Sequence, residues 1–392
     1  MTVNKLHQCK LFKNAQPLVD WLNSVALTHE QIERHNDNIE FINALNGNLD
    51  DFVNDHVSNQ GTNEEYANLK NELAHRLRGN ITNYNDWNLL CKKRATIHIN
   101  ELFNLYVTND TLVIASSFNH ISAERQIDKC PNVFKIDVEN ENGAHNYRIR
   151  QAVNEASLSK YKNIFVYLIG TEFETGRRHN NVAYQFLIDE LEKLSKPYVT
   201  VMDAAQEMFL YRREYNPYHY VIGTSHAIYD RYDVGLLWIN NNLVSEQEQS
   251  AFTGYKRCDV LERLIWGIDV VQDRLVDIIS YKHVIEDCID WTLFDQFNLH
   301  NSQPNFFSLY GSPRYLKNHY VRQFIEKHFI EHAKKGDPGV NVEINYHNAQ
   351  PQLLIRVRPQ TMMFDHNDIV TKFEYFYTNF NKLRMMGGQY EV

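Results

Sequence analysis

Between residues 111 and 204, short apolar runs rich in β-branched and aromatic residues alternate with longer segments of mixed polarity. Strands that alternate with helices of about ten or more residues indicate βαβ units, in which helices cover both faces of a parallel sheet. The sequence therefore predicts an α/β fold with a mostly parallel central sheet. The runs are TLVIASS (111–117), NVFKIDV (132–138), NIFVYLIG (163–170) and YVTVMDA (198–204).

The segments on either side of this region have different patterns. Residues 15–80 space their apolar side chains as helices do, with breaks rich in Asn, Asp and Gly. Residues 259–283 carry a wide apolar stripe, which predicts a long connecting helix. Beyond residue 311 we expect a helix over 314–335, an antiparallel hairpin formed by VNVEINY and LLIRVRP, and a last helix over 367–384.

These patterns predict three parts of the chain. We expect a helical N-terminal region, a large α/β domain that includes the connecting helix, and a small α+β C-terminal domain. The expected bounds are 1–90, 91–300 and 301–392.

Composition excludes several classes of protein. The 392 residues are 43% hydrophobic, enough for a large core, and 40 basic against 49 acidic residues give a net charge of -9, which argues against a nucleic-acid-binding surface. The five cysteines are odd in number, widely spaced and never in a CxxC pair, so we expect no disulfide framework and no zinc ribbon. With no apolar leader and no long apolar stretch, we expect a cytoplasmic protein that neither binds nor spans a membrane.

Candidate site residues follow the predicted strands. Ligands of parallel sheets bind at the carboxyl ends of the strands. Gly170, Asp203 and Ala227 each come directly or shortly after a β-rich run, so we expect them to converge on one crevice.

The segment 198–242 resembles the core of the group II pyridoxal-phosphate (PLP)-dependent amino-acid decarboxylases, the histidine and aromatic decarboxylases among them. In that family an Asp-Ala-Ala turn is followed by Ser-x-His-Lys, and here Asp203-Ala204-Ala205 is followed by Thr224-Ser225-His226-Ala227. The resemblance covers roughly residue 90 to the end, and it implies fold type I of the PLP enzymes, a homodimer, PLP as cofactor and an amino acid or an analogue as ligand.

The resemblance also implies roles for single residues. Asp203 matches the aspartate that pairs with the pyridine nitrogen, Ala205 a small residue on the ring face, and His120 the histidine that stacks on the ring. His226 matches the histidine beside the lysine, so that it would line the site. The further residues that the resemblance places near the cofactor are Gly170 and Thr171 of a Gly-Thr loop, Thr224, Ser225, Thr96, and Arg257 in a segment close to the phosphate.

The departures from the family fall on the cofactor contacts. Ala227 occupies the position of the lysine that holds PLP, and a methyl group cannot form a Schiff base because that bond needs an amine. The stretch KKRATIHIN (92–100) lies where the family has a glycine-rich phosphate loop at a helix N-terminus, and it contains no glycine.

Three interpretations stay open at this point. The chain is a diverged homologue that does not decarboxylate, a pseudoenzyme with a small-molecule or partner-binding role. Alternatively, it is a PLP-dependent L-amino-acid decarboxylase in which Ala227 replaces the native lysine. A third interpretation is acid-base or metal chemistry in the same crevice by Asp203, Glu172 and His226, with His120 as a further metal ligand, although neither His120 nor His226 belongs to an HxxxH or HxH pair.

Overall fold

The computed structural model describes most of the chain between Gly61 and Cys288 and shorter pieces beyond. The described residues up to 269 belong to one compact unit, and those from 270 onward belong to a second. The described ranges are 61–77, 81, 83–136, 144–172, 178–179, 181–210, 213–225, 234–254, 257–273, 275–288, 294–296, 306–311, 341–345, 352–356, 366–367, 369–371, 374 and 378.

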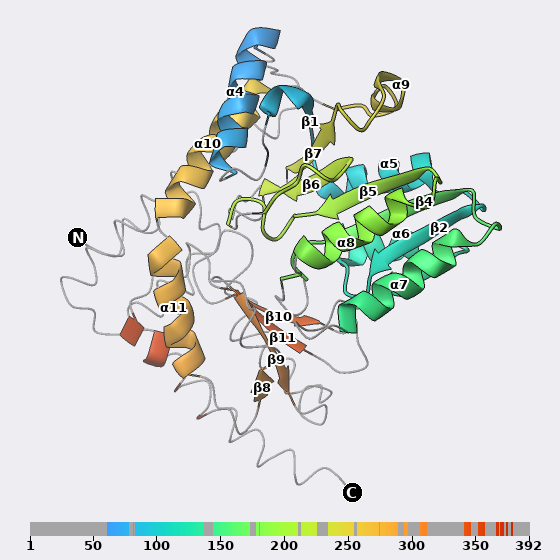
Figure 1. Ribbon diagram of the computed structural model, residues 1–392. Coiled ribbons are helices and arrows are strands. Elements are labelled where there is room, and N and C mark those ends of the chain that lie inside the picture. Colours follow the sequence, from blue (N-terminus) through green and yellow to red (C-terminus); the bar gives the residue numbers. More distant parts are fainter. Residues whose placement is uncertain are drawn as a thin grey trace, which may run out of the picture. The chain divides into compact units, whose positions relative to one another are not determined.

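A seven-stranded sheet in the order β1-β7-β6-β5-β4-β2-β3 forms the centre of the first unit (Figure 1). The neighbours from β6 to β3 are parallel, whereas β7 is antiparallel to both β6 and β1. The strands are β1 (Trp87–Lys92), β2 (Thr111–Ser116), β3 (Val133–Ile136), β4 (Asn163–Ile169), β5 (Tyr198–Asp203), β6 (Tyr220–Thr224) and β7 (Gly235–Asn240).

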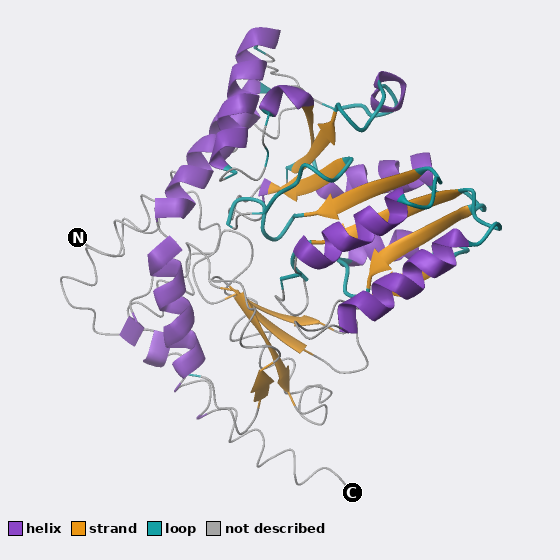
Figure 2. Cartoon of the chain, viewed as in Figure 1, coloured by secondary structure: helices purple, strands orange, loops and turns teal. Residues whose placement is uncertain are grey.

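Helices cover both faces of this sheet (Figure 2). On one face lie α5 (Ala95–Tyr106) and α6 (Ile121–Ile127), and on the other lie α7 (Ala144–Ser157) and α8 (Asn181–Glu192). The strands between them are buried on both sides, which explains why they are continuous apolar runs without the alternation of a half-exposed strand.

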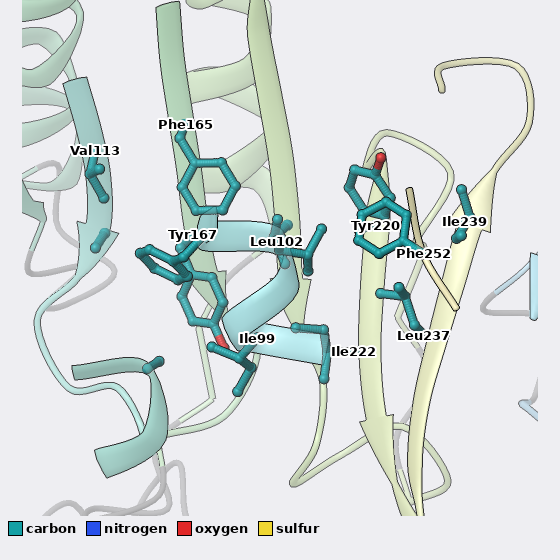
Figure 3. Close-up of a cluster of buried hydrophobic side chains, with 14 of the residues drawn as sticks. Ile99, Leu102, Val113, Phe165, Tyr167, Tyr220, Ile222, Leu237, Ile239 and Phe252 are labelled. Atoms are coloured by element: carbon teal, nitrogen blue, oxygen red, sulfur yellow. The ribbon is translucent and has the colours of Figure 1, made fainter. Parts of the chain in front are cut away.

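The side chains on the α5 face form one apolar cluster (Figure 3). Ile99, Leu102 and Phe103 of α5 pack against residues of six strands, and the ring centroids of Phe103 and Phe165 lie 4.9 Å apart. Such burial contributes about 25 cal/mol for each Å² of apolar surface removed from water, so this cluster is a main source of the sheet's stability. The strand residues include Val113, Ala115, Phe165, Tyr167, Val201, Tyr220, Ile222, Leu237 and Ile239.

Two further helices lie at the start and the end of the first unit. Helix α4 (Asn63–Arg76) begins with a capping box in which Thr62 and Glu65 bond each other's backbone amides. Arg76 Nε donates a 2.7 Å hydrogen bond to Asp269 of α10 (Cys258–Asp273), so the two helices lie side by side (Figure 1). The short elements η2 (Tyr84–Asp86) and α9 (Glu246–Gln249) complete this unit.

The second unit contains α11 (Leu275–Asp287) and a four-stranded antiparallel sheet in the order β10-β11-β9-β8. Strands β10 (Asn341–Asn345) and β11 (Gln352–Arg356) pair with each other, and β11 also pairs with β9 (Phe306–Gly311), which pairs with β8 (Phe294–Gln296). The hairpin predicted for VNVEINY and LLIRVRP is confirmed.

The predicted α/β class with a mostly parallel sheet is confirmed. Strands β1 and β7 are additions, because the sequence analysis did not single out their segments. The connecting helix predicted over 259–283 is two helices, α10 and α11. Most of the helical pattern over 15–80 and the helix expected over 314–335 lie outside the described residues, and the three domain bounds stay a prediction.

Candidate functional site

Asp203 is the last residue of β5, at the carboxyl edge of the parallel strands. Its side chain is buried, and its two carboxylate oxygens accept separate hydrogen bonds. Tyr167 Oη on β4 donates to Oδ2 over 2.6 Å, and the backbone amide of Ala205 donates to Oδ1 over 3.1 Å. Tyr167 reaches this position because Ile169 pairs with Asp203 in the β4–β5 register, and Tyr167 lies two residues earlier on the same face.

Burial raises the pKa of Asp203 above its ordinary value, because a carboxylate loses hydration at the core of the protein. The hydrogen bonds from Tyr167 and Ala205 and the charge of His120 lower this pKa in part, and the nearby Glu207 raises it. Burial and the neighbouring Asp203 carboxylate also hold the pKa of Tyr167 well above 10. The Tyr167 hydroxyl therefore keeps its proton and acts as a donor.

His120 precedes α6 and serves as its N-cap residue. Its Nδ1 accepts a 3.3 Å hydrogen bond from the amide of Ser122 and lies 2.7 Å from Ser122 Oγ. The half-buried imidazole is also close enough to Asp203 for its charge to lower the pKa of that carboxyl. The two side chains that the resemblance places around the cofactor ring therefore interact electrostatically.

Gly170 and Thr171, which follow β4, contact a buried carboxylate other than Asp203. Thr171 Oγ1 donates a 2.7 Å hydrogen bond to Glu207 Oε2. A Cβ atom on Gly170 would lie 2.2 Å from Glu207 Oε1, so only glycine fits there. The amide of Gly170 still donates to the Asp203 carbonyl over 2.8 Å, which holds this turn against β5.

Glu207 forms a fully buried ion pair with Arg213. The Arg213 guanidinium donates to both carboxylate oxygens of Glu207, and its Nη2 also donates to the carbonyls of Gly170 (3.0 Å) and His179 (2.9 Å). Burial by itself lowers the pKa of Arg213, but the Glu207 charge outweighs it and the pKa is raised. Arg213 therefore fastens both ends of the segment 170–179 to the turn that follows β5.

A second buried pair lies in the same segment. Nε2 of His179 lies 2.8 Å from Glu172 Oε1, and both side chains are buried. The His179 ring also stacks on the ring of Tyr184. Glu172, which the acid-base interpretation grouped with Asp203 and His226, is therefore in contact with His179.

The other candidate residues have varied surroundings. Thr224 ends β6 and is buried, and Ser225 Oγ accepts a 2.9 Å hydrogen bond from the amide of Val234. The Arg257 guanidinium donates to the Asp259 carboxylate, with Nε 2.9 Å from Oδ1. Ala205 is half-buried beside Asp203. His226 and Ala227 lie outside the described residues.

Thr96 is the second residue of α5, at the helix start where the resemblance places a phosphate. The N-cap of α5 is Arg94, whose side chain makes no capping hydrogen bond. Gly235 of β7 packs directly against this start, because a Cβ on Gly235 would lie 2.3 Å from the Ala95 nitrogen. Lys92 ends β1, is buried, and forms an ion pair with Glu101.

Three residues of this site were not found from the sequence: Tyr167, Glu207 and Arg213. Tyr167 is one of several aromatic residues in an apolar strand, and Arg213 has an identical neighbour, Arg212, so no local pattern singles either out. The one available signal is the hydroxyl of a tyrosine two residues before the end of a buried strand. A buried hydroxyl needs a partner, and the end of the adjacent strand offers one.

The described part of the site offers carboxylates, a histidine and a tyrosine. It can accept hydrogen bonds at Asp203, and it has a buried ion pair whose arginine also bonds the carbonyls of Gly170 and His179. Within the described ranges, no group of three or more His, Cys, Asp or Glu side chains could hold a metal ion. In the same ranges, no helix is long and apolar enough to cross a membrane.

No family model matches the sequence, and no curated protein matches it either. Solved structures share its fold. A NifS-like protein from Rickettsia africae is 14% identical with a TM-score of 0.62, over 87% of this chain and 96% of that one. A phosphoserine aminotransferase from Cytophaga hutchinsonii is 11% identical with a TM-score of 0.54, over 88% and 95%.

A serine palmitoyltransferase from S. paucimobilis, whose structure holds PLP joined to myriocin, is 10% identical with a TM-score of 0.56, over 91% of this chain and 85% of that one. These neighbours are fold type I PLP-dependent enzymes, and at such low identity the likeness concerns the fold alone. The chain therefore has the fold of the fold type I PLP-dependent enzymes.

Proposed function

We propose that this chain is a diverged relative of the PLP-dependent amino-acid decarboxylases that binds a small ligand and does not decarboxylate it. The observation that carries this proposal is the missing amine. Position 227, where the resemblance places the lysine that holds PLP, is alanine. A methyl group at this position cannot form a Schiff base with PLP, because that bond needs an amine.

The residues that the resemblance places around the lysine and the phosphate do not fit PLP as a resident cofactor. Asp203 can still accept a further hydrogen bond, because a carboxylate has about four lone-pair sites and Tyr167 and Ala205 use two of them. The start of α5 has no glycine-rich loop, and β7 packs closely against it at Gly235. We therefore derive no reaction step through PLP in this chain.

A ligand of this site would meet a buried carboxylate with a histidine close to it. A small molecule with an N–H donor, such as an amino acid or an analogue, matches the carboxylate of Asp203. In this proposal Asp203 and His120 orient the ligand, and the Glu207–Arg213 pair holds Gly170 and His179 in place. None of these residues needs to transfer a proton for binding.

A second candidate function is PLP-dependent decarboxylation by a chain whose native residue at position 227 is lysine. It is favoured by the electrostatic interaction of His120 with Asp203, because the resemblance assigns both residues to the cofactor. The natural gene decides between the two candidates. A lysine codon at position 227 in the unmodified gene would contradict the binding-protein proposal.

The proposed function is tested by a PLP titration of the purified protein followed by absorbance, together with a CO2-release assay on a panel of L-amino acids. Mass determination first verifies alanine at position 227. We expect no saturable spectral change at millimolar PLP and no CO2 release. Saturable binding with a further spectral change on adding an amino acid would refute the proposal.

Random reaction of PLP with surface lysines is the main source of a false positive. The matched control is Val182→Lys, which adds a lysine at an exposed position of α8. Borohydride reduction and mass spectrometry then count the labelled lysines in both proteins. The proposal would be contradicted if, at saturation, one lysine per chain is labelled in the wild type and the same lysine is labelled in Val182→Lys.

The proposal extends to assembly and location. The resemblance implies a homodimer. The cysteine pattern predicts a reducing cytoplasm, and the four cysteines among the described residues are free, which suits such a compartment. Light scattering at micromolar concentration measures the assembly. A monomer would contradict the proposed homodimer but would not affect the proposed ligand binding.

A further inference from the structure

Asp203 lies between two hydrogen-bond donors of the protein itself. The Tyr167 hydroxyl donates to Oδ2 over 2.6 Å, within the range of roughly 2.5–2.7 Å for charge-assisted O–H···O⁻ bonds, and the Ala205 amide donates to Oδ1 over 3.1 Å. A carboxylate has about four lone-pair sites, so these two bonds leave sites for an N–H donor of a ligand. The two donors therefore fix the orientation of the carboxylate and leave it able to bind.

Tyr167 reaches Asp203 from the close-packed core. Its side chain is fully buried in the apolar cluster under α5 (Figure 3), where its ring centroid lies 5.5 Å from that of Phe103. Moving the ring away would leave a cavity in this core. Burial, the Asp203 carboxylate and Glu124 of α6 hold the pKa of Tyr167 well above 10, so the hydroxyl keeps its proton and stays a donor.

The charged groups around Asp203 lie on several elements. Burial is the main cause that raises the pKa of Asp203, and of the groups that lower it the Tyr167 hydroxyl acts most strongly. His120, which precedes α6, also lowers this pKa, and Glu207 in the turn after β5 raises it. The charge of Glu207 is balanced by Arg213. Tyr167 is therefore the main group that favours the ionised form of Asp203.

We propose that Tyr167 is a positioning residue that keeps the Asp203 carboxylate ionised and oriented to accept an N–H donor of the ligand. The inference rests on the proposed function, because it concerns the same site. Tyr167 acts through Asp203 and needs no contact with the ligand. Loss of its hydroxyl would favour the neutral carboxyl, which carries a proton of its own and is a poorer acceptor.

The test measures the protonation of Asp203 directly, without a ligand, in the wild-type protein and in Tyr167→Phe, which keeps the ring and removes only the donor. A protonated carboxyl has an infrared C=O band that a carboxylate lacks. The band that disappears when Asp203→Asn is introduced into each protein belongs to Asp203. Since hydrogen bonds to charged groups are strong, we expect the midpoint of this band in Tyr167→Phe to lie higher by about one pH unit or more. An unchanged or lower midpoint would overturn the inference.

The matched control is Tyr184→Phe. Tyr184 is equally buried, but it lies on the α8 side of the sheet and its hydroxyl donates to the Ile169 carbonyl over 2.9 Å. We expect Tyr184→Phe to leave the midpoint of the Asp203 band at its wild-type pH. An equal rise in both variants would show that a general change in the core moves this titration, which overturns a specific role for Tyr167.

The pH dependence of unfolding gives a second readout. The folded chain has a raised pKa at Asp203 and so binds its proton more tightly than the unfolded chain does. Stability therefore falls as the pH rises from the unfolded pKa to the folded one. Tyr167→Phe should extend this fall to higher pH by about one unit or more, whereas a loss of packing alone lowers the free energy of unfolding equally at every pH. Parallel curves for Tyr167→Phe and the wild type would contradict the inference.

The wild-type protein by itself tests the inference if Tyr167→Phe does not fold. At neutral pH the wild type should lack the band of protonated Asp203, and its presence would overturn the inference. Decarboxylation by the wild-type protein would refute the proposed function and leave the Asp203 titration as it is. An unmoved midpoint in Tyr167→Phe would refute the inference alone.

Discussion

Replacing Arg213 with methionine should destabilise the first compact unit strongly. The guanidinium is almost fully buried and balances the charge of Glu207, whose side chain has no exposure. Removing one partner of a buried ion pair leaves an uncompensated charge and typically costs about 3–5 kcal/mol. The variant also leaves the carbonyls of Gly170 and His179 without the donor they share. Because Arg178 Nε lies 3.7 Å from Glu207 Oε2 and offsets part of its charge, we expect a loss near the lower end of that range, about 3 kcal/mol.

The measurement is urea unfolding of the wild type and the variant, followed by circular dichroism, with a thermal scan beside it. For a unit of this size, we expect the midpoint of thermal unfolding to fall by about 10 °C. The matched control is Arg148→Met on α7, where the exposed guanidinium donates to Gln151. This control should change the free energy of unfolding by about 0.5 kcal/mol or less.

A double variant distinguishes the charge from the packing. In Arg213→Met/Glu207→Met both charges are gone and apolar side chains fill the space, so we expect it to recover about half of the loss or more. The reasoning is refuted if Arg213→Met loses less than about 1 kcal/mol, or if the double variant is less stable than the single one.

Two further predictions concern single residues. Burial lowers the pKa of His98 from 6.5 to about 4, so between these pH values the unfolded chain binds a proton at this side chain and the folded chain does not. The free energy of unfolding should therefore fall by about 3 kcal/mol as the pH drops from 6.5 to about 4. His98→Gln should lose this part of the slope in urea unfolding at several pH values, and equal slopes would contradict the assignment. Gly170→Ala places a Cβ 2.2 Å from Glu207 and should lower the free energy of unfolding by about 3 kcal/mol. In the control, Gly223→Ala, the Cβ meets the flexible Met208 side chain, so the loss should be smaller. An equal loss of stability in the two variants would count against a rigid Glu207.

Of the four parallel strands between residues 111 and 204, β2, β4 and β5 could be found from the sequence because they are largely buried on both faces, whereas the edge strand β3 is partly exposed. Burial on both faces makes a strand a continuous apolar run, and the helices between them cover the sheet. The edge formed by β1 and β7 could not be found in this way. Trp87 of β1 pairs with Asn240 of β7, although more than half of the residues of the first unit lie between them in the sequence. Such pairing is set by the folded chain and leaves no local sequence pattern.

The site was predicted in part for a similar reason. A residue at the end of a parallel strand lies at the edge where ligands bind, so Asp203 was identifiable as a candidate by position alone. Its partner Tyr167 was not, because their contact requires the register in which Ile169 faces Asp203. A shift of that register by one residue would turn the Tyr167 side chain to the other face of the sheet.

The sequence by itself determined the α/β class, the carboxyl-edge position of Asp203 and the absence of an amine at position 227, because these depend on residue type and local periodicity. Only the tertiary structure decided which groups surround that carboxylate. Tyr167, Glu207 and Arg213 are brought to the edge by strand register and by the turn after β5. A hydrogen bond or a buried ion pair depends on distances of a few ångströms between segments far apart in the chain, and only the folded chain sets those distances.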